Sequence, residues 1–419
     1  MNKKTKKRLW RWGTLLLVVI LAVWVQSRWH AWFHNPEEQP YTPLTVPHRV
    51  LLTFGDENES SRNVSWQCDT ILQRSYLELL CLDDDSICRA EVEAKGEVFA
   101  SRQGKAAFYV ARLRNLEPDK HYKYRAISGK KASEWYDFRT YPEHRQKASF
   151  LYVGDVQDTL GGITNRILHE ALKRHPESEL LVCGGDFVER PRNEDWTEAF
   201  NDIDSIAQHI PMLCVTGNHD YLKAIIMELE RRFTLTFSYF LDSKIEDNHV
   251  YTLSYGPIQF FLLDSNREFP YLYSQRQWLK SKLAESRAPW KIVVLHHPLY
   301  SVKGKNNNLI QRWMFDDIIR EYGVDMVMQG HEHAYARVTA KDDGGQQVTP
   351  VYTISHCSPK NYKIDPGDRF DKIDKQGRYY QIVSISGDTL TMRAYETEGH
   401  SLIDSLSIIK DQNIKKIQL

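Results

Sequence analysis

Five short apolar runs in the middle of the chain each end in residues that can bind metals. Between Phe150 and His333 the chain contains, in order, FLYVGDVQD, LLVCGGD, PMLCVTGNHD, WKIVVLHHP and VDMVMQGHEH. A continuous apolar run of about four to eight residues is typical of a strand buried on both faces. Because ligand sites of open α/β sheets form beyond the carboxyl ends of strands, we expect the five polar endings to form one site.

The endings supply carboxylate, amide and imidazole groups without a thiolate. Such a set suits Zn or another divalent first-row metal, such as Mn or Fe. A buried strand gains nothing from ending on a charge, yet LLVCGGD ends on Asp186. A carboxylate placed between two cations explains this charge, so we expect Asp186 to bridge two metal ions. The glycines before several endings fit sharp turns in which the backbone passes close to a ligand.

The chain divides near residue 145 into two parts with different patterns. From Pro47 to Thr140 it offers short strand-like segments with polar turns, which predicts a small β-sandwich over residues 45–142. From Ala148 strands alternate with helical patterns, which is typical of an α/β sheet. The segment SQRQWLKSKLAE predicts one of these helices, beginning at a capping box. We expect this second domain to cover residues 147–410.

The N-terminus has the layout of an export signal or a signal anchor. MNKKTKKRLWRW carries six basic residues and no acid, and the uncharged run GTLLLVVILAVWV follows it. That run is short for a membrane span, but Trp24, Trp29 and Trp32 could complete one as an interfacial belt. We expect residues 1–35 to anchor the chain in a membrane, with the rest outside the cytoplasm. A cleaved signal, leaving a secreted or periplasmic protein, is the alternative.

The charge balance argues against one class of partner. Lys and Arg number 55, as do Asp and Glu, so the formal net charge is zero. A chain without a basic excess lacks the electrostatic footprint of a nucleic-acid-binding protein, and we expect no nucleic-acid partner. The sequence does not indicate an oligomeric state.

As an ordered set, the motifs G-D, G-G-D, G-N-H-D, H-H-P and G-H-E-H resemble those of the calcineurin-like metallophosphoesterase superfamily. The sandwich and the segment GHEHAYAR are similar to purple acid phosphatases in particular. The motifs lie within residues 150–337, and the sandwich and the C-terminal segment extend the likeness over most of the remaining chain. The resemblance implies an α+β or α/β architecture: a fibronectin type III-like sandwich, then a four-layer αββα domain with two metal ions between its sheets.

The resemblance also implies a role for each ending. One metal would be bound by Asp155, Asp186 and His333, and the other by Asp186, Asn218, His296 and His331. His219 would be the general acid for the leaving group, and Asp220 would orient it. Asn218 would also contact the substrate. His297 would face the substrate or serve as a structural histidine.

Two positions depart from the family pattern. Many members have D-x-H in the first motif, where this chain has Gln157. Its amide oxygen either coordinates a metal or the side chain hydrogen-bonds to a metal-bound water. Purple acid phosphatases have an Fe(III)-binding tyrosine where this chain has Glu189, so iron–phenolate chemistry is not implied here. Glu189 is a ligand, an acid behind the ligands, or an exposed residue beside Arg190 and Arg192.

These observations predict an exported phosphoesterase that uses two divalent ions, Mn, Zn or Fe. We expect it to act as an acid phosphatase-like phosphomonoesterase on phosphorylated small molecules, by attack of a metal-bound hydroxide with His219 as general acid. A phosphodiesterase or nucleotide pyrophosphatase is an alternative, because the same metal pair supports both. A metal-retaining, non-catalytic binding protein is the alternative from another class, and the presence of His219 and Asp220 argues against it.

Overall fold

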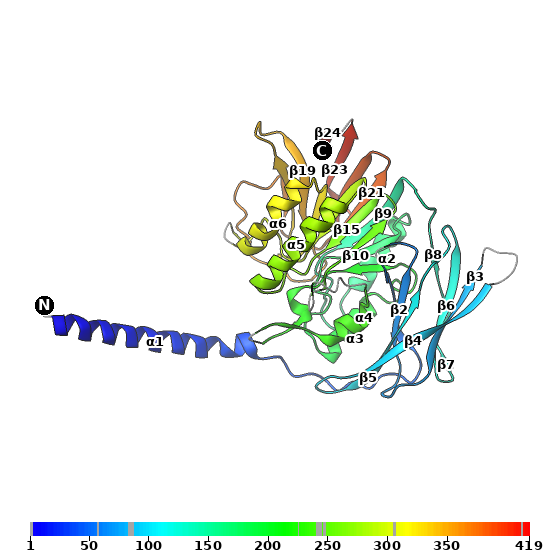
Figure 1. Cartoon of the computed structure of the whole chain (residues 1–419), viewed down its shortest axis with the longest axis horizontal. Helices are drawn as coiled ribbons and strands as arrows, with labels where there is room; N and C mark the ends of the chain where they lie inside the picture. The colour runs from blue at the N-terminus through cyan, green and yellow to red at the C-terminus, as the bar shows by residue number, and fades with distance from the viewer. Residues whose placement is uncertain are drawn as a thin grey trace.

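The computed structural model describes residues 3–56, 58–82, 88–224, 226–239, 245, 249–304, 307–411 and 414–419. In this part of the chain a long N-terminal helix leads into a β-sandwich, and a larger domain of sheets and helices follows (Figure 1).

Helix α1 (Lys3–Phe33) projects from the body of the molecule (Figure 1). Its segment Lys3–His30 is long and apolar enough to cross a membrane, with a mean hydropathy of 1.7, and none of its apolar window is buried. An N-terminal signal sequence has the same properties. The helix therefore fits both fates that the sequence left open for this segment.

The sandwich holds a separate apolar core around Trp66, Tyr109 and Tyr124. One strand, β4, belongs to both of its sheets: residues 88–93 pair with β3, and residues 94–100 pair with β5. The sandwich strands are β1 (His48–Thr53), β2 (Arg62–Gln67), β3 (Ser75–Cys81), β4 (Cys88–Ala100), β5 (Lys105–Leu113), β6 (His121–Ser128), β7 (Lys131–Ala132) and β8 (Tyr136–Arg139).

The first sheet of the larger domain has the strand order β24-β23-β22-β21-β9-β10-β11, and β9, β10 and β11 run parallel. Its strands are β9 (Lys147–Val153), β10 (Leu180–Cys183), β11 (Met212–Cys214), β21 (Tyr379–Ser386), β22 (Thr389–Glu396), β23 (Leu402–Asp411) and β24 (Ile414–Gln418). The connections between them contain α2 (Thr164–Arg174), α3 (Asn193–Asp202), η1 (Asn218–Asp220), β12 (Tyr221–Leu222), β13 (Glu228–Leu229) and α4 (Arg231–Thr236).

The second sheet has the order β14-β15-β16-β17-β19-β18-β20, and β15, β16, β17 and β19 run parallel. Its strands are β14 (Tyr251–Tyr255), β15 (Ile258–Leu262), β16 (Trp290–Val294), β17 (Met326–Gln329), β18 (Tyr335–Lys341), β19 (Gln347–Ile354) and β20 (Lys372–Asp374). Helices α5 (Phe269–Glu285) and α6 (Leu309–Glu321) connect its parallel strands.

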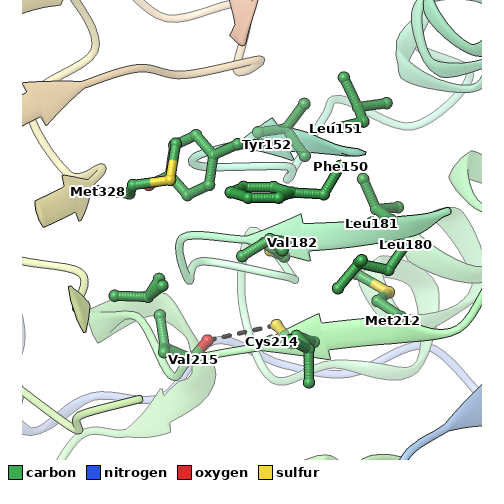
Figure 2. Packing of buried hydrophobic residues seen from close by; sticks show 14 of the residues in the cluster. Phe150, Leu151, Tyr152, Leu180, Leu181, Val182, Met212, Cys214, Val215 and Met328 are labelled. Carbon is green, nitrogen blue, oxygen red and sulfur yellow. Dashed lines mark hydrogen bonds between the residues drawn. The ribbon is translucent and has the colours of Figure 1, made fainter. Parts of the chain in front are cut away.

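The two sheets pack against each other through alternate residues of their strands. The rings of Phe150 in β9 and Phe260 in β15 have centroids 5.3 Å apart. Tyr152 of β9 and Met328 of β17, both labelled in Figure 2, belong to the same cluster. Phe261 of β15 instead joins a second cluster with residues of α5 and α6. Helices therefore cover the outer face of the second sheet, and α2 and α3 pack on the first.

Two details differ from the expectations drawn from the sequence, and a third concerns a strand pair on which the sequence made no prediction. Helix α5 begins at Phe269, so Ser274 lies inside it and donates to the Pro270 carbonyl rather than capping the helix. The first sheet continues past residue 410 through β24. Strand β1 pairs with β11 at Thr53 and Met212, which joins the sandwich to the first sheet. Capping spacing is a local signal, and a proline at the start of α5 supports the earlier start.

Candidate metal centre

The five apolar runs form strands β9, β10, β11, β16 and β17, and their polar endings meet at one edge of the larger domain. Ligand atoms of Asp155, Asp186 and His296 all lie within 4.8 Å of one another. Each of these three side chains is buried. Parallel pairing within both sheets puts all five carboxyl ends on the same side, which explains how residues far apart in sequence converge.

Asn218, His296 and His331 form one half of the centre. The Nδ1 of His296 lies 2.9 Å from the Gly184 carbonyl and donates to it, which leaves the Nε2 lone pair facing inward. This Nε2 lies 3.2 Å from Asn218 Oδ1 and 3.2 Å from His331 Nδ1. His331 Nδ1 is 2.8 Å from the same Asn218 oxygen. Three ligand atoms from three strand endings thus face one point.

Asp155, Gln157 and His333 form the other half. His333 Nδ1 lies 2.8 Å from the Lys360 carbonyl, so its Nε2 is directed to Asp155 Oδ1 at 3.4 Å. The Gln157 amide nitrogen lies 3.4 Å from Asp186 Oδ2. That Asp186 oxygen is also 3.4 Å from His296 Nε2, so Asp186 stands between the two halves.

These donors fit a pair of metal ions. Ligand atoms held at about 2.0–2.2 Å from one ion lie roughly 3 Å from each other, as the atoms of both halves do. Asp155 Oδ1 and Gln157 Oε1 are buried and have no hydrogen-bond partner in the protein. A buried carboxylate oxygen without a partner is costly, and a cation removes that cost. Asp186 can coordinate an ion on either side.

The backbone at four of these residues is held in a strained conformation. Asp155, Asp186, His331 and His333 have φ values of 46°, 52°, 71° and 46°. Non-glycine residues rarely adopt positive φ, and such residues concentrate at functional sites. The left-handed turn lets each side chain point into the centre directly after a buried strand. The sequence expectation placed sharp turns at the preceding glycines. Gly185, with a φ of 93°, shares the turn with Asp186, whereas after β9 and β17 the ligand residues themselves adopt the positive φ.

Two of the glycines are required for close approach. A Cβ at Gly217 would lie 2.1 Å from Asp186 Oδ1, and a Cβ at Gly330 would lie 2.5 Å from Asp155 Oδ2. Any side chain at either position would displace a ligand carboxylate. The expectation that backbone passes close to the ligands at these positions agrees with the structure.

The charges of the centre compensate one another. Burial opposes protonation of His296, but the Asp186 carboxylate outweighs it and raises the pKa of His296 to about 9. Burial lowers the pKa of His331 well below its ordinary value, and His297 and His296 lower it further. Burial opposes ionisation of Asp186, yet His296 and His219 hold its pKa well below the ordinary value. The ionised Asp186 carboxylate is the state that binds cations, and a cation in the centre would replace the proton that Asp186 otherwise holds on His296.

His219 and Asp220 are not arranged as the sequence predicted. Both Asp220 oxygens accept backbone N–H groups, from Phe187 at 3.0 Å and from Gly217 at 2.7 Å. Asp220 therefore fixes the loops around Asp186 and does not orient the His219 ring. The His219 Nδ1 instead lies 2.6 Å from the Glu189 carbonyl oxygen. The short loop η1 turns the two neighbouring side chains in different directions, which their adjacency in sequence cannot reveal.

Glu189 belongs to a charged group behind His219. Its carboxylate pairs with Lys360 and lies 3.9 Å from His219 Nδ1 and 3.9 Å from Arg190. Arg190 also contacts the His219 ring. Of the three alternatives for Glu189, the geometry favours an acid behind the ligands.

His297 lies at the edge of the centre. Its Nδ1 is 3.0 Å from the Ser265 hydroxyl, and its ring centroid is 4.3 Å from that of His331. Burial, followed by the neighbouring His296, lowers the pKa of His297 to about 3. A neutral, half-buried ring held by a hydroxyl is compatible with both roles that the sequence left open.

Sequence reasoning missed two further strand endings. VYTIS ends at His356, which is fully buried and lies parallel to His333 with ring centroids 5.2 Å apart. FFLL ends at Asp264 and Ser265, and Ser265 holds His297. Both endings carry the signal used for the other five, an apolar run followed by a polar residue. No sequence pattern identifies Tyr362, which stacks on His333 at 4.3 Å.

Comparison with known families agrees with this architecture. The family described as calcineurin-like phosphoesterase matches residues 148–335. The family described as purple acid phosphatase, N-terminal domain, matches residues 47–140.

Individual relatives are distant. Purple acid phosphatase 23 of Arabidopsis thaliana is 23% identical over 296 residues, which cover 62% of this chain and 62% of that protein. Phosphoenolpyruvate phosphatase of Allium cepa is 25% identical over 370 residues, covering 82% of this chain and 70% of that protein. The structure of a purple acid phosphatase from yellow lupin (Lupinus luteus) seeds superposes with a TM-score of 0.73 at 16% identity, covering 88% of this chain and 75% of that one. This last similarity concerns the fold alone.

The two matched families follow one another in the order in which the sandwich and the larger domain occur. The two matches together cover residues 47–140 and 148–335 of this chain. The chain therefore contains a purple acid phosphatase N-terminal domain followed by a calcineurin-like phosphoesterase domain.

Proposed function

We propose that the protein is an exported, metal-dependent phosphomonoesterase that holds two divalent ions at the edge described above. The observation that carries the proposal is the meeting of carboxylate, amide and imidazole atoms from five strand endings at 2.8–3.4 Å. The proposed ligands are Asp155, Gln157, Asp186 and His333 on one side and Asp186, Asn218, His296 and His331 on the other. When bound, the ions would supply Lewis-acid charge for the phosphoryl oxygens and lower the pKa of water.

The protein groups have separate tasks in this proposal. The Gly184 and Lys360 carbonyls orient the rings of His296 and His333, so the nitrogen facing the centre keeps its lone pair. Asp220 holds the loops after β10 and β11 together through backbone N–H groups. Positioning of this kind matters because phosphoryl transfer depends on geometry and charge neutralisation more than on covalent chemistry.

His219 is the proposed general acid. Its Nδ1 faces the Glu189 carbonyl at 2.6 Å, and its Nε2 lies 4.0 Å from Asp186 Oδ2, on the side of the centre. The Glu189 carbonyl and the Arg190 guanidinium both contact Nδ1 and fix the ring, so the proton that passes to the leaving oxygen would be held at Nε2. The Glu189 carbonyl thus takes the orienting role that the sequence had given to Asp220. Asn218 and His297 flank the same space and are the proposed substrate contacts.

The names of the relatives support a phosphomonoester substrate. A purple acid phosphatase and a phosphoenolpyruvate phosphatase are 23% and 25% identical to this chain over 296 and 370 residues. The exposed apolar helix α1 supports export, with the helix as anchor or as signal. Because the chain covers 62% of the first relative's length, its substrate needs direct measurement.

The test is steady-state hydrolysis by the full chain of para-nitrophenyl phosphate, an alkyl phosphate and bis-para-nitrophenyl phosphate, with and without added Mn or Zn. We expect metal-dependent hydrolysis of both monoesters. Faster hydrolysis of the diester would identify a phosphodiesterase, and no hydrolysis by metal-loaded protein would favour a binding protein.

A variant separates the chemistry from metal binding. His219→Ala should keep both metals and lower turnover of the alkyl ester by roughly 10²–10⁴, the usual contribution of a general acid. The aryl ester, whose leaving group needs less protonation, should lose less. The matched control is His209→Ala, a histidine at the sandwich boundary that pairs with Asp137. Equal losses for the two esters would contradict the acid role.

A further inference from the structure

The exposed apolar side chains of the larger domain lie in particular segments. Exposed single apolar residues are common, but a set confined to one edge indicates contact with another surface. Trp313 is 68% exposed and Ile226 is 64% exposed. Among the described residues from 147 to 419, the large exposed apolar side chains are Leu160, Ile226, Phe269, Tyr273, Ile310, Trp313, Tyr362, Leu402 and Leu419.

Seven of these side chains follow β9, β11, β15, β16 or β19, whereas Leu402 and Leu419 lie at the start of β23 and after β24. Leu160 follows β9, Ile226 follows β11 and the short β12, and Tyr362 follows β19. The other four lie in the first two turns of α5 and α6, after β15 and β16. These strands end at the edge where the metal centre lies, so the segments after them surround the centre. We call this set of segments the apolar rim.

The apolar rim lies on the side from which α1 leaves. Two residues after the end of α1, Asn35 forms a reciprocal pair with the backbone of Lys223, at 2.9 Å to its carbonyl and 2.8 Å from its N–H. Lys223 directly follows β12 in the loop that contains Ile226. In Figure 1, α1 projects from the side of the body on which α5 and α6 also lie.

The connection between α1 and the centre is short. Two residues extend at most about 7 Å, and the five residues from Asn218 to Lys223 extend at most about 18 Å. Residues 26–33 continue α1 beyond its apolar run by roughly 12 Å, which exceeds the depth of one headgroup layer, about 5–8 Å, by only a few ångströms. If α1 spans a bilayer, the metal centre must therefore lie close to its surface.

Cationic side chains accompany the apolar rim. Lys303 Nζ lies 4.0 Å from the centre of the Tyr362 ring and 3.4 Å from the His331 carbonyl. Burial, followed by the nearby Arg190, lowers the pKa of Lys223, whose backbone pairs with Asn35. A mixture of apolar and basic groups is typical of surfaces that contact bilayers with anionic headgroups.

We propose that the apolar rim lies on the membrane that holds α1, and that the centre hydrolyses phosphomonoesters carried by lipid headgroups at that surface. The substrate part of this proposal rests on the proposed phosphatase function, whereas the contact with the bilayer does not. The rim would bring the centre to phosphoryl groups that stay at the membrane, and its cations would attract them.

The contact can be tested without measuring activity. Ile226→Cys and Trp313→Cys in the full chain are labelled with a fluorophore in nanodiscs of phosphatidylcholine and phosphatidylglycerol that contain nitroxide-labelled lipid. Ile71→Cys and Trp135→Cys, exposed apolar positions of the sandwich, are the matched controls. We expect strong quenching at the two rim positions and little at the controls. Equal quenching at all four positions, or none at the rim, would overturn the proposal.

The substrate class needs a second measurement. The Ile226→Ser, Trp313→Ser double variant should lose roughly tenfold in hydrolysis of phosphatidic acid in the same nanodiscs, because two large apolar contacts are removed. Hydrolysis of para-nitrophenyl phosphate should stay unchanged, as should both activities of the Ile71→Ser, Trp135→Ser control. Equal effects on both substrates would overturn the lipid assignment. An unmodified chain that hydrolyses neither substrate would overturn the phosphatase function and leave the quenching result intact.

Discussion

The two halves of the metal centre share Asp186 but offer different donors. On one side, His296, His331 and the Asn218 amide place their ligand atoms 2.8–3.2 Å apart. On the other, Asp155 and His333 stand 3.4 Å apart, with the Gln157 amide nearby. Two imidazoles favour Zn, whereas a carboxylate with amide oxygen suits a harder ion such as Mn. The two halves of the centre would therefore prefer different metal ions, and Asp186 would be shared between them.

The largest expected effect comes from removing the shared carboxylate. Asp186→Ala takes a ligand from both halves and leaves the remaining groups around an underfilled site. Because the loss of one electrostatic contact in an active site already costs about 10²–10³-fold, we expect activity to fall by at least this factor, together with the metal content. Elemental analysis beside hydrolysis of para-nitrophenyl phosphate provides the measurement. Two retained metals with near-normal turnover would refute the bridging role.

The second test separates the halves. After loading with one equivalent each of Mn and Zn, we expect His331→Ala to lose mainly Zn and His333→Ala to lose mainly Mn. Each variant should lose about 10²-fold or more in turnover, since each ion contributes charge to the same reaction. Elemental analysis of the two variants in parallel is the measurement. Loss of the same metal from both variants would show that the halves are not chemically distinct.

A smaller loss of activity is expected from replacing Glu189, which contacts His219 and Lys360 but is not a proposed metal ligand. Glu189→Gln removes the charge that pairs with Lys360 and lies near His219, but leaves the carbonyl contact to the ring. We expect the metal content to be unchanged and the turnover of alkyl esters to fall about tenfold. This is the lower limit of the roughly 10–100-fold loss seen when a residue that holds a functional group in place is replaced. Glu97→Gln, which breaks an exposed pair with Arg231 on the sandwich, is the control. Lost metal in Glu189→Gln would instead make Glu189 a ligand.

The smallest effect on activity is expected at Asp202, a buried carboxylate outside the centre. Burial, followed by Asp158 and Glu198, raises the pKa of Asp202 to about 8. The folded protein therefore keeps a proton there that the unfolded chain releases near pH 4. As a result, the free energy of unfolding falls as pH rises from about 4 to 8, by a few kcal/mol at most.

Asp202→Asn should remove this dependence. We expect a higher melting temperature than the unmodified protein at pH 8, a similar one at pH 4, and unchanged turnover. Thermal unfolding at both pH values is the measurement. A variant that melts lower at pH 8 would show that the ionised carboxylate has a stabilising partner. Despite burial, neighbouring imidazoles hold the pKa of Asp186 low, whereas burial and the carboxylates of Asp158 and Glu198 raise the pKa of Asp202. A lower melting temperature of the variant at pH 8 would contradict this explanation of the difference between the two carboxylates.

Several features of the fold could be predicted from the sequence because they depend on local patterns. The apolar runs that form β9, β10, β11, β16 and β17 and the alternating strands of the sandwich are such patterns. The start of α5 and the continuation of the first sheet through β24 were not predicted. A capping spacing inside a helix looks the same as one at its start. Pairing of β24 depends on a partner strand rather than on its own residues.

The same division applies to the centre. The sequence by itself determined which residue types stand at the ends of the buried strands, because side-chain chemistry and position after an apolar run are both local. Only the tertiary structure decided what each group contacts. Lys360 reaches Glu189 across 171 positions, and Asn35 reaches Lys223 across 188. Such contacts orient His219 through a backbone carbonyl and hold the end of α1 at the loop after β12. They arise when separate strands pack side by side, and no short stretch of sequence encodes them.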